Sequence, residues 1–596
     1  MIRGNTRSVI ALLVCAVMLF TAACSSGGNG SATNSGTGGN TGTPNAAGGN
    51  AGTKTEAKEE LTITVFSMLA NYAGEQPGWF AKMIKDKFNI KLNIIASNLA
   101  GGQQKIATMM ASGDMGDLVV FGSNGEDFQD AIKAGLLLDW SKDGVLEKYG
   151  PDILKNAGQA IEANKQQFGG GTAVYGIGHD VGSGDGPSEG AEMTFGPNLR
   201  WDLYQKLGSP EINTLDDYLT ILKQMQELEP KSESGRPTYG FSLWSDWDGN
   251  YMTLAKVVGQ FYGYQEGDGF NPAGLTLTSV NSDEWQGLLD EDGYYFKGLK
   301  FYFDANQMGL LDPDSLTQKF SDASNKFKDG QIFFAQFPWL SNVYNTPEHT
   351  SAGKGFALVP FKEEKVMSYG MNQYGGNRVW AIGSKAKDPA RIMEFLNWLY
   401  TPEGIMESNY GPQGLAWDLD DAGKPFVTEY GYKALPANTE PVPAEYGGGT
   451  FKDGTNQINN TTLKNSMINP LTGEPYDYNL WSAVLNNDPN PVTKSWREAM
   501  GAMTEKDYFV KNDLIAVQKV VFTGEAPATP PADIQQKISD IGKVIKEHSW
   551  KMIFAKNETE YDKLKKQMID KSKGLGYDEV VKYEIDLTTR TVFANN

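Results

Sequence analysis

Two tryptophans in one short polar segment are the first residues whose side chains suggest a binding chemistry. Trp244 and Trp247 belong to the run Trp-Ser-Asp-Trp-Asp-Gly-Asn that ends at Asn250. Indole rings stack on flat apolar surfaces, and short polar side chains beside them can bond hydroxyl groups. That combination is typical of sites for ring-shaped, hydroxyl-rich ligands. Packing in a core is an equal alternative for both rings.

The cysteine and histidine content argues against several catalytic and metal chemistries. Both cysteines lie in the first 24 residues, so the rest of the chain has no thiol for a disulfide, a nucleophile or a zinc ligand. The three histidines are scattered, with no H-x-x-x-H pair for a helix-borne zinc site. We therefore expect no catalytic residue, no cofactor and no metal.

The N-terminus has the pattern of a secretion signal that ends in a lipidated cysteine. Arg3 and Arg7 precede an apolar run from Val9 to Phe20. This run is shorter than the ~20 apolar residues that a membrane-spanning helix needs. The following Thr21-Ala-Ala-Cys24 resembles a bacterial lipobox, although Thr21 stands where leucine is usual. We predict a signal peptide over 1–23 and a lipid, such as palmitate, on Cys24; cleavage without lipid is the alternative.

A flexible linker and a large folded body are expected to follow. Residues 24–58 are mostly Gly, Ser, Asn, Thr and Ala, which bury too little apolar surface to order a backbone. The remainder is long enough for more than one domain, and the 13 Trp, 26 Tyr and 28 Phe supply a sizeable core. A net charge of -20 argues against binding nucleic acid.

The start of the body alternates strands and helices. Apolar patterning predicts strands over 61–66, 90–95 and 117–121, with helices over 79–88 and 103–112 between them. This order is typical of an α/β fold with a parallel sheet, in which ligands bind beyond the carboxyl ends of the strands. Asn71, Ser123 and Asn124 follow two of these strands and are candidate ligand contacts. His179 is a weaker candidate, because a backbone-bonded loop residue explains it better.

Several segments, in order, resemble one protein family. They are Ile106–Asp114, Gly116–Val120, Ala134–Asp139, Leu199–Gly208, Thr214–Tyr218, Phe327–Gln331, Phe337–Leu340, Val379–Gly383 and Asp388–Leu396. Together they are similar to the family 1 extracellular solute-binding proteins of ABC importers, which have the maltose-binding-type fold. The C-terminal segments Ser549–Lys556, Glu560–Ile569 and Gly574–Val581 resemble large Gram-positive lipoproteins of the LipO type.

The resemblance implies a two-lobed, periplasmic-binding-protein-like type II fold. Each lobe is a sheet flanked by helices and is discontinuous in sequence. Lobe 1 would comprise residues 59–175 and 376–480, and lobe 2 residues 176–375 and 481–596. The Gly-rich crossings near 174–180 and 370–378 would form the hinge about which the lobes close on a ligand.

The resemblance also marks further candidate ligand contacts. Trp339 matches a tryptophan that stacks on sugar in the family, with packing as the alternative. Asn372 and Tyr374 lie on the second crossing, where a plain hinge role is equally favoured. Trp417 follows a Gly-x-x-Gly loop, and a ligand contact and packing in the core are equally favoured for its ring. The segment 229–235 lacks the carboxylate spacing of the family's calcium loop, so no calcium is expected.

These features together predict a monomeric, non-catalytic receptor on the extracellular face of a bacterial membrane. It would be held there by the lipid on Cys24, bind an oligosaccharide and deliver it to ABC permease subunits. One alternative is a glycoside hydrolase that uses Asp246 and Asp248, which flank Trp247, as its carboxylate pair. The other is an oligopeptide-binding receptor, which the abundance of tryptophan disfavours modestly.

Overall fold

The structure is a computed structural model that describes residues 59–97, 99, 102–266, 274–437 and 439–591. The predicted signal peptide, Cys24 and the linker over 24–58 lie outside the described residues. Within the described part of the chain, no helix is long and apolar enough to cross a membrane. The same residues contain no group of three or more His, Cys, Asp or Glu side chains that could hold a metal ion.

A six-stranded sheet organises the N-terminal part of the body. Its order is β2-β3-β1-β4-β13-β5. The strands are β1 (Leu61–Ser67), β2 (Gly74–Glu75), β3 (Ile90–Ala96), β4 (Leu118–Phe121), β5 (Ile177–Gly178) and β13 (Val379–Ile382). Strand β1 pairs in parallel with β3 and β4, whereas β13 is antiparallel to β4. The predicted α/β fold is confirmed, and the five elements predicted over 61–121 are present.

Alternating side chains along the strands bury both faces of this sheet. In β4, Leu118 and Val120 join one buried cluster, and Val119 and Phe121 join another on the opposite face. The larger cluster, called the first core, draws on Ile63–Val181 and Trp380–Val484. The helices of this part of the chain are α1 (Gly78–Phe88), α2 (Gly102–Ser112), α3 (Glu126–Lys133), α4 (Val145–Tyr149), α5 (Pro151–Phe168), α13 (Pro389–Leu399), α14 (Pro402–Tyr410), α15 (Glu429–Ala437) and α16 (Ser482–Asn487).

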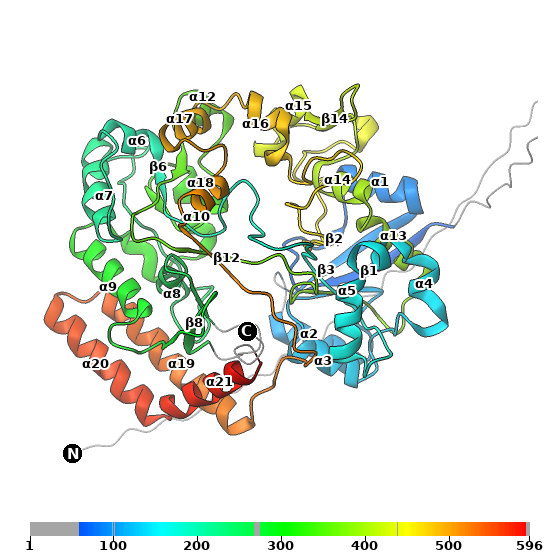
Figure 1. The fold of residues 1–596 in the computed structure, drawn as a ribbon, viewed down its shortest axis with the longest axis horizontal. Coiled ribbons are helices and arrows are strands. Elements are labelled where there is room, and N and C mark those ends of the chain that lie inside the picture. The colour runs from blue at the N-terminus through cyan, green and yellow to red at the C-terminus, as the bar shows by residue number, and fades with distance from the viewer. Residues whose placement is uncertain (1–58, 98, 100–101, 267–273, 438, 592–596) are drawn as a thin grey trace, which may run out of the picture. The chain divides into compact units, whose positions relative to one another are not determined.

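A second core contains buried residues from Met193–Met367 and Val492–Val580. Its strands are β6 (Asn198–Arg200), β7 (Tyr264–Glu266), β8 (Thr276–Ser279), β9 (Trp285–Gly287), β10 (Phe334–Ala335), β11 (Phe356–Leu358), β12 (Val366–Ser368) and β16 (Ile515–Val517). Its helices are α6 (Trp201–Lys206), α7 (Asp217–Leu228), α8 (Thr253–Gln260), α9 (Tyr294–Gln307), α10 (Phe320–Lys328), α11 (Pro338–Ser341), α12 (Pro347–Ser351), α17 (Pro491–Met500), α18 (Glu505–Lys511), α19 (Ala532–Ile553), α20 (Glu558–Gly574) and α21 (Tyr577–Thr591). The C-terminal helices α19 and α20, orange and red in Figure 1, pack together, and α19 also packs on α9.

The chain passes between the two cores at three places, over 181–193, 367–379 and 484–492. The first two passages run beside one another: the Gly182 N–H donates to the Asn372 carbonyl at 2.8 Å, and β5 pairs with β13. Residues 518–531 form a further connecting segment beside the second passage. Phe522 on it stacks on Tyr374, with ring centroids 4.5 Å apart.

Candidate ligand-binding site

The Trp244–Asn250 loop is held firmly at its base. Trp244 is 1% exposed and packs in the second core, while Trp247 is 40% exposed. The two rings meet edge to face, with centroids 5.0 Å apart. The Trp550 indole N–H donates to Asp248 at 2.6 Å, and the Thr253 hydroxyl donates to the Trp247 carbonyl at 2.9 Å. Just before the loop, Tyr239 and Phe241 form isolated parallel bridges with Ile332 and Leu311.

Trp339 lies next to this loop. It stands in the first turn of α11, 44% exposed, with its ring centroid 5.5 Å from that of Trp247. It also stacks on Phe337, with ring centroids 4.9 Å apart and an interplanar angle of 20°. Phe320, at the start of α10, packs against Trp247 at 4.6 Å and Trp339 at 5.7 Å. The structure thus brings Trp244, Trp247 and Trp339 together.

Ring contacts continue from Trp339 toward the second passage. Phe337 packs on Phe195 at 6.0 Å, and Phe195 packs on Tyr369 at 6.3 Å. Tyr369 directly follows β12 and is 42% exposed. We call Trp247, Trp339, Phe337, Phe195 and Tyr369 the aromatic row. Each of its three exposed rings packs on other rings: Trp339 on Phe337, Tyr369 on Phe195, and Trp247 on Trp244 and Phe320. The exposed rings are therefore fixed in place before any ligand binds.

Asp248 carries the clearest electrostatic perturbation beside the row. Burial raises the pKa of its carboxyl to about 6, although the hydrogen bonds from Trp550 and Thr253 favour the charged form. Asp246, on the other side of Trp247, accepts the Phe320 N–H at 3.0 Å and so fixes the start of α10. Both carboxylates that flank Trp247 therefore hold neighbouring backbone or indole N–H groups.

The candidates from the first core lie at the carboxyl end of its sheet. Asn71 and Ser123 are exposed, and Asn124 is half-buried. The loops after β1 and β4 touch, since the Gly122 N–H donates to Met68 Sδ at 3.3 Å. This part of the prediction, that both loops share one edge, follows from the parallel pairing of β1 and β4.

Candidates on the passages are bound mainly to neighbouring segments. Asn372 donates to the Gly375 carbonyl and accepts from the Tyr374 N–H, while the Tyr374 ring is covered on one face by Phe522. His179 Nδ1 accepts the Arg378 N–H at 3.2 Å, and burial lowers the pKa of its ring to about 4. The contact of His179 with Arg378 links the end of β5 to the second passage, and that of Tyr374 with Phe522 links the second passage to residues 518–531.

Trp417 packs inside the first core. It is 5% exposed, its indole N–H donates to the Gly411 carbonyl at 2.7 Å, and its ring lies 6.4 Å from that of Trp481. Its described contacts position the Gly411–Trp417 loop, and they leave little of the ring for a ligand.

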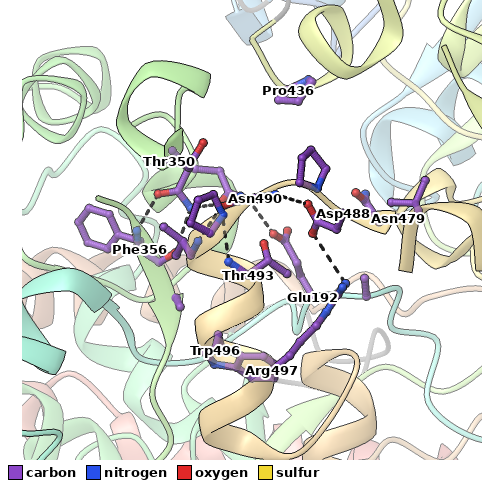
Figure 2. Close-up of a pocket in the computed structure, with 18 of the residues that line it drawn as sticks. Glu192, Thr350, Phe356, Pro436, Asn479, Asp488, Asn490, Thr493, Trp496 and Arg497 are labelled. Atoms are coloured by element: carbon purple, nitrogen blue, oxygen red, sulfur yellow. Dashed lines mark hydrogen bonds and ion pairs between the residues drawn. The ribbon is translucent and has the colours of Figure 1, made fainter. Parts of the chain in front are cut away.

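A pocket of about 490 Å³ lies where the third passage joins the two cores. Pro436 and Asn479 line it from the first-core side, and Thr350 and Phe356 from the second (Figure 2). Asn342, three residues beyond Trp339 and at the end of α11, also lines it and donates to Glu192 at 2.9 Å. The pocket and the aromatic row therefore share α11.

The pocket carries more negative than positive charge. Glu192 and Glu505 line it together with the ion pair of Arg497 and Asp488, whose atoms are 3.8 Å apart. Displacement of bulk water by the surrounding protein, with the charge of Asp477, raises the pKa of Glu192. Burial and the charge of Glu192 raise the pKa of Glu505 well above its ordinary value.

Sequence reasoning missed Phe195 and Tyr369 of the row and the acidic residues of the pocket. Phe337 stands in a segment quoted for the family resemblance, but nothing in the sequence marks its ring as a contact of Trp339. Phe195, Tyr369 and the acidic residues reach the site from segments that are far apart in the chain, so local patterns carry no signal for them.

Comparison with known proteins defines the class of the chain. The family model described as bacterial extracellular solute-binding protein matches residues 79–416. This match covers more than half of the chain, which therefore belongs to that family. No match was found among curated proteins.

Solved structures share the fold at low sequence identity. The alginate-binding protein AlgQ2, solved without calcium ion, superposes with a TM-score of 0.59 at 18% identity, covering 89% of this chain and 98% of its own. The substrate-binding protein FusA of S. pneumoniae, in complex with kestose, gives 0.57 at 15% identity and covers 90% and 100%. An HMO-binding solute-binding protein from Bifidobacterium longum infantis gives 0.50 at 15% identity and covers 89% and 99%. The two-lobed solute-binding fold is thereby established for this chain.

Proposed function

We propose that this protein is the oligosaccharide receptor of an ABC importer. The observation that carries the proposal is the aromatic row, whose exposed Trp247, Trp339 and Tyr369 rings form a pre-fixed apolar strip long enough for more than one sugar ring. Two of the similar structures are described as ABC-transporter proteins that bind kestose or HMO, which supports the same ligand class.

The receptor would work by hinged closure of two lobes, residues 59–175 with 376–480 and residues 176–375 with 481–596. The aromatic row belongs to the second lobe, and Asn71, Ser123 and Asn124 would meet the ligand from the first. Because closure is driven only by ligand that binds the closed state better, no chemical change of the ligand is needed. The hydrogen-bonded roles of Asp246 and Asp248 favour this over the glycoside hydrolase alternative.

The receptor would be held at the extracellular face of the membrane by lipid on Cys24, with permease subunits as its partners. Metabolic labelling with a palmitate analogue tests the anchor: the wild-type chain should incorporate label and stay with the membrane fraction. Cys24→Ala should remain unlabelled and appear in the medium. Membrane retention of unlabelled Cys24→Ala would contradict the anchor while leaving the receptor proposal intact.

A thermal-shift screen of the full chain against oligosaccharides of differing linkage and length, with oligopeptides alongside, tests the ligand class. A ligand that binds only the folded state raises the melting temperature by mass action, about 2.7 kcal/mol of stabilisation at a hundredfold excess over Kd. At least one oligosaccharide should raise it, without being cleaved. A shift with peptides alone, or hydrolysis of the sugar, would contradict the proposal.

A further inference from the structure

The acidic pocket is placed to receive one end of a ligand that lies on the aromatic row. Trp339 lies on α11, and Asn342, three residues later, caps the C-terminus of that helix with helical backbone angles, a spacing that puts two side chains on the same side of a helix. Asn342 lines the pocket and donates to Glu192 there. The segment that carries Glu192 continues to Phe195, which is part of the row. A chain of sugar rings that extends past Trp339 would therefore reach Glu192.

The positive charge that lines the pocket is already committed. Arg497 is its one described basic lining residue, and its Nε and Nη1 donate to the carbonyls of Met503 and Leu485 at 2.9 and 2.8 Å. The remaining guanidinium nitrogen faces Asp488 at 3.8 Å. A ligand carboxylate would thus find no free guanidinium with which to pair.

Among the lining carboxyls, Glu192 is the one that is exposed in the pocket and open to a ligand. Glu505 lines the pocket beside it and accepts backbone N–H groups of Met193, at 2.8 Å, and of Leu358. Asp477 and Glu189 lie close enough behind them to act on their charges. Both lining carboxyls already resist ionisation, so an additional anion at this place is unfavourable. A hydroxyl or an amine can donate to them.

We propose, on the basis of the proposed function, that Glu192 and Glu505 make the receptor select neutral or amine-bearing sugar units and reject uronic acids. A uronate that enters the pocket would place its carboxylate beside Asp488, Glu192 and Glu505, where burial and neighbouring negative charge already disfavour the ionised form of a carboxyl group. Neutral sugars differ from uronates only at C6, so charge alone separates the two ligand classes.

Matched tetrasaccharides test this selectivity on the full chain. Isothermal titration would use gluco, manno and galacto tetrasaccharides, each as the neutral sugar and as its C6-uronate. In every pair that binds, the neutral member should bind at least about tenfold more tightly. The double variant Glu192→Gln with Glu505→Gln should bring that ratio toward one. Glu498→Gln, on the exposed side of α17 and not lining the pocket, should leave it unchanged.

The outcomes separate this inference from the proposed function. Equal or tighter binding of a uronate, or a ratio unchanged in the double variant, overturns the charge selectivity but leaves the oligosaccharide receptor standing. If no tetrasaccharide of either charge binds, both proposals fail. Should the double variant not fold, Glu192→Gln alone serves, because Glu192 is exposed and its amide can still accept from Asn342.

Discussion

At the scale of single residues, the site depends on rings that are partly exposed and are supported by other aromatic rings. Trp247 rests on Trp244 and Phe320, and Trp339 rests on Phe337, so each ring offers its remaining surface without having to reorganise. Ring stacking on a sugar is favourable in proportion to the apolar area that it removes from water.

Removal of Trp339 should therefore weaken oligosaccharide binding. Trp339→Ala is expected to raise Kd by about 5- to 150-fold, equivalent to ~1–3 kcal/mol. Trp285→Ala is the matched control, since Trp285 is exposed to a similar degree, 42%, but lies on β9 outside the aromatic row. Titration calorimetry with the oligosaccharide that stabilises the protein most would measure both. An equal effect of the two substitutions would remove the row from the site.

Asp248 should make the stability of the protein depend on pH. Its pKa is about 6 in the folded chain, above the ordinary 3.8, so the folded state holds a proton that the unfolded state has lost between these values. The free energy of unfolding should consequently fall as pH rises from about 4 to 6, by on the order of 2 kcal/mol from this group.

The nearby charges of Asp246 and Lys546 act on Asp248 in opposite directions, so the comparison requires a variant without the titration. In Asp248→Asn, urea denaturation at pH 4, 5, 6 and 7 should show a smaller loss of stability across this interval than in the wild type. The asparagine side chain of this variant has one oxygen fewer than that of Asp248, so one N–H donor loses its partner and the variant is less stable at every pH. The test is therefore how stability changes with pH, and not its absolute value. Parallel curves for the two proteins would contradict the raised pKa.

At the scale of elements, the sequence predicted well what local patterning determines. Strands β1, β3 and β4 and helices α1 and α2 follow from apolar periodicity, because each buries one face or stripe. The segment over 518–531 has no such periodicity. It is fixed instead by distant partners: Gln129 donates to the Pro527 carbonyl at 3.1 Å and Gln167 to the Glu525 carbonyl at 3.0 Å.

The candidate site shows the same division. The Trp244–Trp247 pair and Trp339 could be found from the sequence, the first from its polar surroundings and the second from the family resemblance. Phe195 and Tyr369 could not, because they join the row from segments far apart in the chain, and only the packed second core brings them together. Trp417 shows the converse, since an aromatic residue in a Gly-rich loop looks the same in sequence whether it is buried or exposed.

Close packing of α8 against α9 supports the second core and gives an element-scale prediction. A methyl group at Gly298, on α9, would lie 2.2 Å from the Ala255 carbonyl oxygen of α8, so the helices must separate to admit it. Gly298→Ala should lower the free energy of unfolding by about 1–3 kcal/mol. Gly158→Ala, on α5 where a methyl group meets nothing within 4 Å, should be neutral or stabilise by about 0.5–1 kcal/mol. Urea denaturation that ranks the variants in the reverse order would contradict this packing.

At the scale of the whole molecule, three passages and one connecting segment join two cores that are built from alternating stretches of the chain. Hydrogen bonds between the first two passages, such as that from Gly182 to the Asn372 carbonyl, couple them so that they can bend together. With the ligand contacts divided between the two cores, a bound sugar would stabilise the arrangement in which both touch it.

Small-angle X-ray scattering of the full chain, with and without the oligosaccharide that raises its melting temperature most, tests this mechanism most directly. The account predicts a smaller radius of gyration with the sugar present, a smaller change for Trp339→Ala at the same sugar concentration, and recovery of the sugar unaltered. Superimposable curves at saturating sugar would contradict closure of the two lobes on their ligand.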